Sequence, residues 1–328
     1  MHPIQITQTT QTSSERRFDC TNAEFFVCMG RAGAHFMEIN VRQLQSSAWI
    51  KFAREFGGVL VVGHGTRNPS GSGQLFDLVR QMQCIEPAVK ITGCFLELSE
   101  PTIEMAIEQL HAQGIRKILV VPVLLFTAAH ALHDIPDAVS LAASRFDIQV
   151  IGQTGSLGTH PAVVGLSQAR FSEVAALEEG GTCPVNACAR VQCDFGRCNG
   201  RSLKLGRIGL AMVGRGTSDP AALAHMRELT ELKIAQLPAV SYQTGFFAGG
   251  EPNVDGLLEE ATTWNCNTII VQPHLLFEGE LIEQLRRKVL QCQARSPKQQ
   301  WLIARTLGAD PKLAEVFLEL AHERLLSE

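Results

Sequence analysis

The sequence predicts an α/β protein of two tandem, similar lobes, each a mainly parallel sheet flanked by helices, with a cleft between the lobes. Two observations predict this fold class: the chain repeats itself, and each repeat alternates short apolar runs with amphipathic helical patterns. GHGT at 63–66 returns as GRGT at 214–217, an offset of 151 residues (214 − 63). The phrases that begin at Cys94, Val120 and Ser156 return at nearly the same offset. Chance similarity would not keep four phrases in register, so the chain is a duplication.

Length and composition indicate the domain organisation. A chain of 328 residues, 45% apolar and 19% charged, has globular composition and is long enough for two domains with cores of their own. We expect a poorly ordered N-terminal extension, a catalytic lobe, a cysteine-containing linker and a second lobe that lacks the catalytic residues. The extension is predicted at 1–56, the catalytic lobe at 57–172, the linker at 173–205 and the second lobe at 206–328.

Net charge and cysteine usage exclude several classes of protein. The formal net charge of −4 provides no basic field of the kind that nucleic-acid-binding proteins carry, and no apolar window reaches transmembrane length. Residues 1–16 are polar and do not resemble a secretory signal peptide, and the ten cysteines show no secreted disulfide pattern. We therefore expect a cytoplasmic protein, a monomer or small homo-oligomer, that binds neither nucleic acid nor membrane.

Strand and helix patterns alternate along the first repeat. The continuous apolar run at 59–62 is typical of a strand buried on both faces, and 91–95 and 118–121 are predicted as further short strands. Apolar residues within 103–110 recur at helical spacing and predict one buried helix face. Pro101, preceded by Glu100, suits the first helical position, and Gly114 suits the helix end. Parallel sheets bind ligands beyond the carboxyl ends of their strands, so functional residues are expected there.

Comparison of the two repeats separates architecture from chemistry. The glycines of GHGT and GRGT are kept, which indicates a role in the turn after the strand. Three ionisable residues occur only in the first repeat, each at or just past a strand end: His64, Glu97 and His130. The second repeat has Arg215, Ala248 and Leu281 in their places. Two imidazoles and a carboxylate suit Fe²⁺, Co²⁺, Zn²⁺ or Ni²⁺ and also accept protons near neutral pH. Each residue alone could be a solvated or capping side chain, but their joint absence from the second repeat indicates a shared functional site.

Other polar residues have a structural alternative. His160 is replaced by Asp310 in the second repeat, which favours a helix cap in both, and His274 lies at an apolar strand end, as a core or rim histidine would. Arg67 and Arg215 could each bind a substrate carboxylate, because guanidinium matches that group bidentately. Arg215 could equally pair with an acidic residue between the lobes.

Four long motifs resemble the two-module form of the sirohydrochlorin chelatase family: VGHGTR, CFLELSEPTIE, VVPVLLFTAAHALHDIP and VGRGTSDP. The resemblance covers roughly 57–320. It implies insertion of Co²⁺ or Fe²⁺ into sirohydrochlorin, for cobalamin or siroheme biosynthesis, without ATP or an organic cofactor.

The same resemblance implies roles for individual residues. The two active-site histidines match His64 and His130, and the acidic partner matches Glu97 best, although alignment leaves Glu100 open. These residues would bind the substrate metal or accept the pyrrole protons. The substrate carries several carboxylates, and its predicted binding residues are Arg67, Arg215 and Thr127.

The predicted linker contains four cysteines at strict five-residue intervals: Cys183, Cys188, Cys193 and Cys198. Four thiolates can hold zinc or an iron–sulfur cluster, but the usual C-x₂-C pairs are missing. A linker with reactive thiols and no metal is the alternative interpretation.

Two other functions can be compared with the chelatase. A non-catalytic metal or tetrapyrrole carrier, a metallochaperone, could use the same histidines and glutamate to bind without turnover. A histidine phosphatase has an arginine before its histidine, whereas this chain has Gly63 there, which argues against that class. The residues do not distinguish cobalt from iron as the metal.

Overall fold

The computed structural model describes residues 47–126, 133–175 and 207–327. The first half contains, in chain order, α2 (Ser47–Arg54), β1 (Gly57–Gly63), α3 (Pro69–Ile85), β2 (Lys90–Phe95), α4 (Ile103–Ala112), β3 (Lys117–Pro122), α5 (Ile135–Arg145), β4 (Gln149–Gln153) and α6 (Pro161–Ala175). The second half contains β5 (Ile208–Gly216), α7 (Pro220–Ile234), β6 (Ala239–Ala248), α8 (Val254–Thr262), β7 (Thr268–His274), α9 (Glu280–Arg295), β8 (Gln300–Ile303) and α10 (Pro311–Leu326).

The strands form two parallel four-stranded sheets of identical topology, ordered β2-β1-β3-β4 and β6-β5-β7-β8. All three strands predicted in the first repeat are present. The predicted class, two similar α/β units with parallel sheets, is therefore confirmed. A parallel connection needs a crossover, and a helix supplies one between each pair of successive strands.

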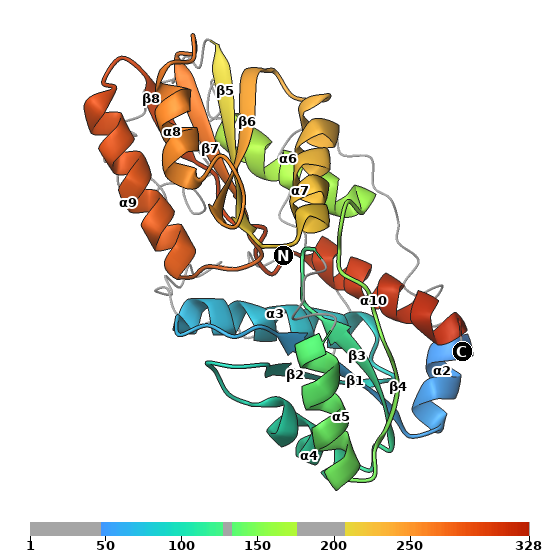
Figure 1. Cartoon of the computed structure of the whole chain (residues 1–328). Helices are drawn as coiled ribbons and strands as arrows, with labels where there is room; N and C mark the ends of the chain where they lie inside the picture. Colours follow the sequence, from blue (N-terminus) through green and yellow to red (C-terminus); the bar gives the residue numbers. More distant parts are fainter. Residues whose placement is uncertain (1–46, 127–132, 176–206, 328) are drawn as a thin grey trace, which may run out of the picture. The chain divides into compact units, whose positions relative to one another are not determined.

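The first sheet is covered on both faces, and its central strand β1 is apolar and buried at every position. Val59 and Val61 of β1 pack in one cluster with residues of α3 and α10, whereas Leu60 and Val62 pack in a second cluster with residues of α4 and α5. Figure 1 shows α3 and α10 on one side of this sheet and α4 and α5 on the other. Successive side chains of a strand point to opposite faces, so a continuous apolar run requires this double covering.

The last helix of each half packs on the sheet of the other half. Helix α6 contacts β7 and α7, whereas α10 contacts α3, β3 and β4. Figure 1 shows α6, in light green, among the yellow and orange elements of the second half. Although most of α6 falls within the predicted catalytic lobe 57–172, it packs on the second sheet, and its end at Ala175 extends into the predicted linker. The predicted domain boundaries otherwise stay a prediction.

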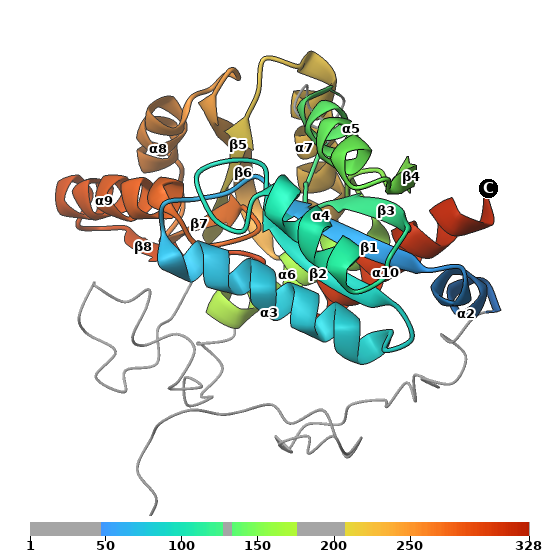
Figure 2. The same ribbon diagram turned by 90° about the horizontal axis from the view of Figure 1, so that it is seen from below.

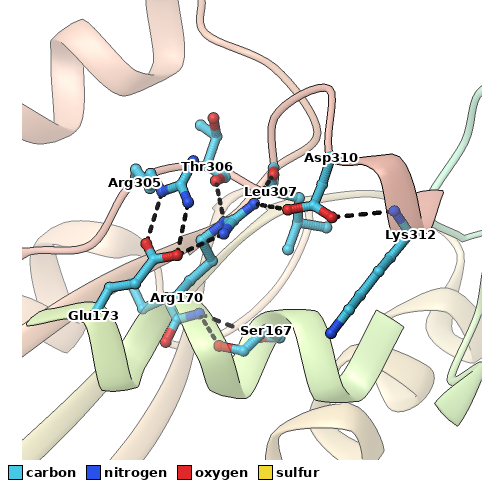
Figure 3. Close-up of polar contacts among 9 residues, drawn as sticks. Ser167, Arg170, Glu173, Arg305, Thr306, Leu307, Asp310 and Lys312 are labelled. Carbon is cyan, nitrogen blue, oxygen red and sulfur yellow. Dashed lines mark hydrogen bonds and ion pairs between the residues drawn. The ribbon is translucent and has the colours of Figure 1, made fainter. Parts of the chain in front are cut away.

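Arg170 anchors α6 to the second half. Its side chain is only 3% exposed, and it donates hydrogen bonds to the Thr306 carbonyl (3.1 Å) and the Leu307 carbonyl (2.6 Å). It also donates to Asp310 Oδ2 and Glu173 Oε1, both at 2.7 Å (Figure 3). These partners satisfy a buried charge, which would otherwise be expensive to remove from water.

The second half has buried polar residues where the first half is apolar. Lys233 is fully buried beside the Phe171 ring and donates a hydrogen bond to the side-chain oxygen of Gln272, and burial lowers its pKa well below the usual range. His274 is buried at the end of β7, where burial and, secondarily, Lys233 lower its pKa to about 3. It is therefore a core histidine, as predicted. The first half has Met82, Val121 and Val123 at the positions equivalent to Lys233, Gln272 and His274.

Two predictions about helices are wrong. Helix α4 begins at Ile103, not at Pro101, because the Thr102 side chain accepts a hydrogen bond from the Met105 amide and so caps the helix two residues further on. Residues 47–54, placed in a poorly ordered extension, form α2, which buries Trp49 against the core. Helix α2 contacts β1 and α10, and it lies beside the end of α10 in Figures 1 and 2.

The predicted helix caps of the two repeats are confirmed. The Ala162 amide donates to His160 Nδ1 (3.2 Å) at the start of α6, and the Lys312 amide donates to Asp310 Oδ1 (3.1 Å) at the start of α10. His160 is therefore accounted for as a structural residue. None of the helices in the described part of the chain is long and apolar enough to cross a membrane.

Candidate functional site

His64 and Glu97 lie together because adjacent strands deliver them to the same edge of the first sheet. Strands β1 and β2 run parallel, with Gly63 opposite Phe95 at their carboxyl ends. Backbone pairing continues beyond the strands, since the Leu96 amide donates to the Gly63 carbonyl (2.9 Å) and the Glu97 amide donates to the His64 carbonyl (3.0 Å). The two side chains thus emerge where parallel sheets present ligand-binding groups.

Gly65 makes this close pairing sterically feasible. Its φ is +106°, a conformation that side chains disfavour, and a Cβ added there would lie 1.7 Å from the Glu97 carbonyl oxygen. Gly216 repeats the arrangement in the second half, with φ +80° and a Cβ position 1.8 Å from the Ala248 oxygen. The glycine therefore serves the turn in both halves, and the halves differ in the residues beside it.

The His64 imidazole and the Glu97 carboxylate form a polar pair open to solvent. His64 Nε2 lies 3.6 Å from Glu97 Oε1, and the two side chains are 21% and 53% exposed. Imidazole nitrogen and carboxylate oxygen are both ligands of divalent transition metals, and both accept protons. The carboxylate beside His64 is that of Glu97, while Glu100 lies in the exposed turn before Pro101. Of these two glutamates, Glu97 is therefore the one that lies beside His64.

Several predicted site residues fall outside the described residues. His130 and Thr127 belong to 127–132, and the four cysteines belong to 176–206. Their roles stay predictions. Within 47–126, 133–175 and 207–327, no group of three or more His, Cys, Asp and Glu residues is arranged to hold a metal ion. The pair of His64 and Glu97 is what the described structure brings together.

Arg67 and Arg215 are available to bind an anion. Arg67 follows the His64 turn, Arg215 occupies the equivalent of the His64 position in the second half, and both side chains are exposed. Among the residues that the structure describes, neither guanidinium has a carboxylate within ion-pair distance. Pairing of Arg215 with an acidic residue between the lobes therefore finds no support in this part of the chain.

A loop of the second half approaches the His64 turn. The Glu278 amide donates to Gln74 Oε1 of α3 (2.8 Å), and the Glu278 carbonyl oxygen comes so close to Gly71 that a Cβ there would lie 2.4 Å away. The same Cβ position lies 2.9 Å from the Thr66 methyl carbon. The second half therefore supplies backbone next to Thr66, two residues beyond His64.

Reasoning from the sequence missed one residue beside the site. Ser99 ties the loops after β1 and β2 together, since its hydroxyl bonds both backbone groups of Thr66. Comparison of the two repeats could have identified Ser99, because the second repeat has Gly250 at the equivalent position, just as it has Ala248 in the place of Glu97.

The fold and the site define a class of protein: a duplicated α/β unit with an imidazole–carboxylate pair at the sheet edge of one copy only. The chain belongs to the CbiX family, whose family model matches residues 58–174 and again 209–324. The two matches correspond to the two halves described above.

Comparisons with individual proteins agree with this assignment. The chain is 27% identical over 265 residues to a sirohydrochlorin ferrochelatase of Priestia megaterium, a match that covers 81% of this chain and 88% of the relative. It is 25% identical over 272 residues to a sirohydrochlorin cobaltochelatase of the same organism, covering 82% and 80%. Among solved structures, SirB from Bacillus subtilis with Fe³⁺ matches with a TM-score of 0.65 and 25% identity, covering 82% of this chain and 95% of that one.

Proposed function

We propose that this chain is a sirohydrochlorin chelatase, an enzyme that inserts Co²⁺ or Fe²⁺ into sirohydrochlorin without ATP. The observation that carries the proposal is the pair of His64 and Glu97 at the strand ends of the first half. The second half repeats the backbone with Arg215 and Ala248 instead. Relatives named sirohydrochlorin ferrochelatase and sirohydrochlorin cobaltochelatase, each matched over at least 80% of both chains, support the substrate and the two metals.

The site residues suit the steps that metal insertion requires. The ion must lose water, the metal must meet the pyrrole nitrogens, and the N–H protons must leave. A neutral His64 imidazole can donate its lone pair to the substrate metal or accept a proton. The Glu97 carboxylate, 3.6 Å from Nε2, can neutralise positive charge at the metal or act as base. His130 is proposed as the second imidazole on the sequence evidence alone.

Exposed cations are proposed to bind the substrate. Sirohydrochlorin carries several carboxylates, and the guanidinium groups of Arg67 and Arg215 are exposed and matched to such groups. Thr127 is proposed as a further substrate-binding residue on the sequence evidence alone. A second half that binds substrate carboxylates through Arg215 would provide a substrate-binding surface and would not catalyse metal insertion itself. A cytoplasmic location is proposed with the function.

A turnover measurement tests the function. The protein is mixed anaerobically with a large excess of sirohydrochlorin and either Co²⁺ or Fe²⁺, and the absorption spectrum is followed. A chelatase forms many equivalents of metallated product per protein molecule. A carrier changes the spectrum by at most one equivalent, and that result would refute the proposal. The ratio of kcat/KM for the two metals gives the preferred one.

A further inference from the structure

Besides backbone bonds, one side-chain hydroxyl group links the two loops that carry His64 and Glu97. Ser99 Oγ accepts a hydrogen bond from the Thr66 amide (3.1 Å) and donates one to the Thr66 carbonyl (2.6 Å). The Ser72 hydroxyl lies 3.3 Å from Ser99 Oγ, close enough to donate a third bond. A hydroxyl has one proton and two lone pairs, so these three contacts use its full bonding capacity.

These contacts close a ring of bonds around the site. The Glu97 amide donates to the His64 carbonyl (3.0 Å), and the Ser99 amide donates to the Glu97 carbonyl (2.8 Å). Ser99 Oγ then returns to Thr66, two residues after His64. A rotation of either loop would break at least one of these bonds. The ring therefore holds the backbone of His64 and Glu97 in one relative position.

The turn inside this ring is strained. Leu98 has a φ of +62°, and the bond from the Ser99 amide to the Glu97 carbonyl spans only this residue, as in the rare γ-turn of positive φ. An apolar side chain in this conformation costs about 1–3 kcal/mol and persists only where the surroundings enforce it. The Leu98 side chain is 52% exposed, so its packing does not enforce the turn. The bond from the Ser99 amide to the Glu97 carbonyl and the bonds of the Ser99 hydroxyl to Thr66 span this turn and stabilise it.

The second half shows that the fold does not require this arrangement. At the positions of Leu98, Ser99 and Ser72, it has Gly249, Gly250 and Leu223, respectively. Gly249 has a φ of +66°, so the backbone follows a similar path with a residue that adopts it freely. The hydroxyl bridge thus occurs in the half that carries His64 and Glu97, and glycine replaces it in the half that carries neither.

We propose that Ser99, supported by Ser72, is a positioning residue that sets the separation of His64 and Glu97 before the substrate metal binds. The inference rests on the proposed function, because it assigns Ser99 a part in metal insertion. Ser99 acts through the backbone of Thr66 and Glu97 and does not itself touch the metal. Preorganisation of this kind matters because displacement of reacting groups by about 1 Å can cost about 10²-fold in rate.

The test compares Ser99→Ala, which removes the hydroxyl, with Ser99→Thr, which keeps it. For Ser99→Ala we expect kcat for metal insertion to fall at least about tenfold while KM for sirohydrochlorin stays within about twofold. Affinity for Co²⁺ alone, measured by calorimetry, should fall with it. Ser99→Thr should keep kcat within about threefold of the wild type because it keeps the hydroxyl. Ser99→Val, which has the shape of threonine without a hydroxyl, should be as impaired as the alanine, and equal activity of the threonine and valine variants would indicate a merely space-filling role. Wild-type kcat and Co²⁺ affinity in Ser99→Ala would overturn the proposal, as would a Ser99→Thr variant as impaired as the alanine.

Crystal structures of the wild type and Ser99→Ala separate this inference from the proposed function. The wild type should keep His64 Nε2 and Glu97 Oε1 near 3.6 Å, and the variant should show them further apart with Thr66 displaced. An unchanged site in the variant would contradict the positioning role. A wild type that binds Co²⁺ but does not turn over would refute the chelatase proposal, and the positioning role would then be judged on geometry and Co²⁺ affinity.

Discussion

Gly65→Ala is expected to abolish most of the activity by moving His64 away from Glu97. The new Cβ would lie 1.7 Å from the Glu97 carbonyl oxygen, whereas such contacts do not fall below 3.0 Å, so the two loops must separate by more than about 1 Å. The φ of +106° adds strain of about 1–3 kcal/mol. We expect a loss of about 2–4 kcal/mol in the free energy of unfolding and a fall in kcat of about 10²-fold.

Gly216→Ala is the matched control within the same chain. Its Cβ would lie 1.8 Å from the Ala248 oxygen at a φ of +80°, so the steric conflict and the loss of stability should be similar. The second half has neither the histidine nor the glutamate, so kcat at saturating substrate should stay within about threefold of the wild type. The assays are anaerobic Co²⁺ insertion and urea unfolding of both variants.

Two results would refute this reasoning. If Gly65→Ala loses stability but keeps wild-type kcat, the separation of His64 and Glu97 is irrelevant to insertion. If Gly216→Ala loses kcat as severely as Gly65→Ala, the effect comes from general damage to the fold and not from the site.

Three further predictions concern buried charged and polar residues. Arg170→Leu should lower the free energy of unfolding by about 3–5 kcal/mol in chemical denaturation, because it leaves buried acceptors unpaired; a loss below 1 kcal/mol would contradict the anchoring role. His274→Val should make the free energy of unfolding less sensitive to acid. In the wild type, His274 takes up a proton near pH 6.5 in the unfolded chain but only near pH 3 in the folded protein, so acidification from pH 7 to pH 5 lowers the free energy of unfolding by about 2 kcal/mol. Urea unfolding at both pH values should show this loss in the wild type and not in the variant. Lys233→Met combined with Gln272→Val should raise stability at pH 7, because burial lowers the pKa of the Lys233 amine and so disfavours its charged form in the folded protein but not in the unfolded chain. The gain should shrink as the pH approaches 10.5, where the unfolded chain also loses this proton, and a gain independent of pH would contradict the lowered pKa.

The duplication made much of the fold predictable. Strands at 59–62, 91–95 and 118–121 follow from apolar runs, and the buried face of 103–110 follows from helical spacing. The start of that helix was misplaced because proline at 101 is compatible with a first turn, while the capping bond of Thr102 depends on the geometry of the loop before it. Local pattern can suggest a helix end but does not decide between neighbouring caps.

The packing of α6 and α10 could not be predicted from periodicity. An apolar helix face indicates that a helix is covered, and it does not identify the sheet that covers it. The choice depends on contacts far apart in the sequence, such as those between Arg170 and the carbonyl groups of Thr306 and Leu307. Local sequence patterns do not indicate which residues far apart in the chain form contacts of this kind.

The sequence alone pointed to one pair of residues in the candidate site. Comparison of the repeats singled out His64 and Glu97, and the structure places them 3.6 Å apart. The same comparison could have found Ser99, but a serine opposite a glycine looks like an ordinary loop difference until its bonds to Thr66 are seen.

The central claim is that the first half performs the chemistry and the second half, on the same backbone, does not. The most direct measurement is kcat for Co²⁺ insertion by His64→Arg and by Arg215→His, with His160→Asn as a control for loss of a histidine that caps a helix. We predict that His64→Arg loses at least about 10²-fold in kcat. Arg215→His should keep kcat within about threefold with a raised KM for sirohydrochlorin, and His160→Asn should match the wild type in both constants. Equal losses of kcat in His64→Arg and Arg215→His, or wild-type kcat in His64→Arg, would contradict the account.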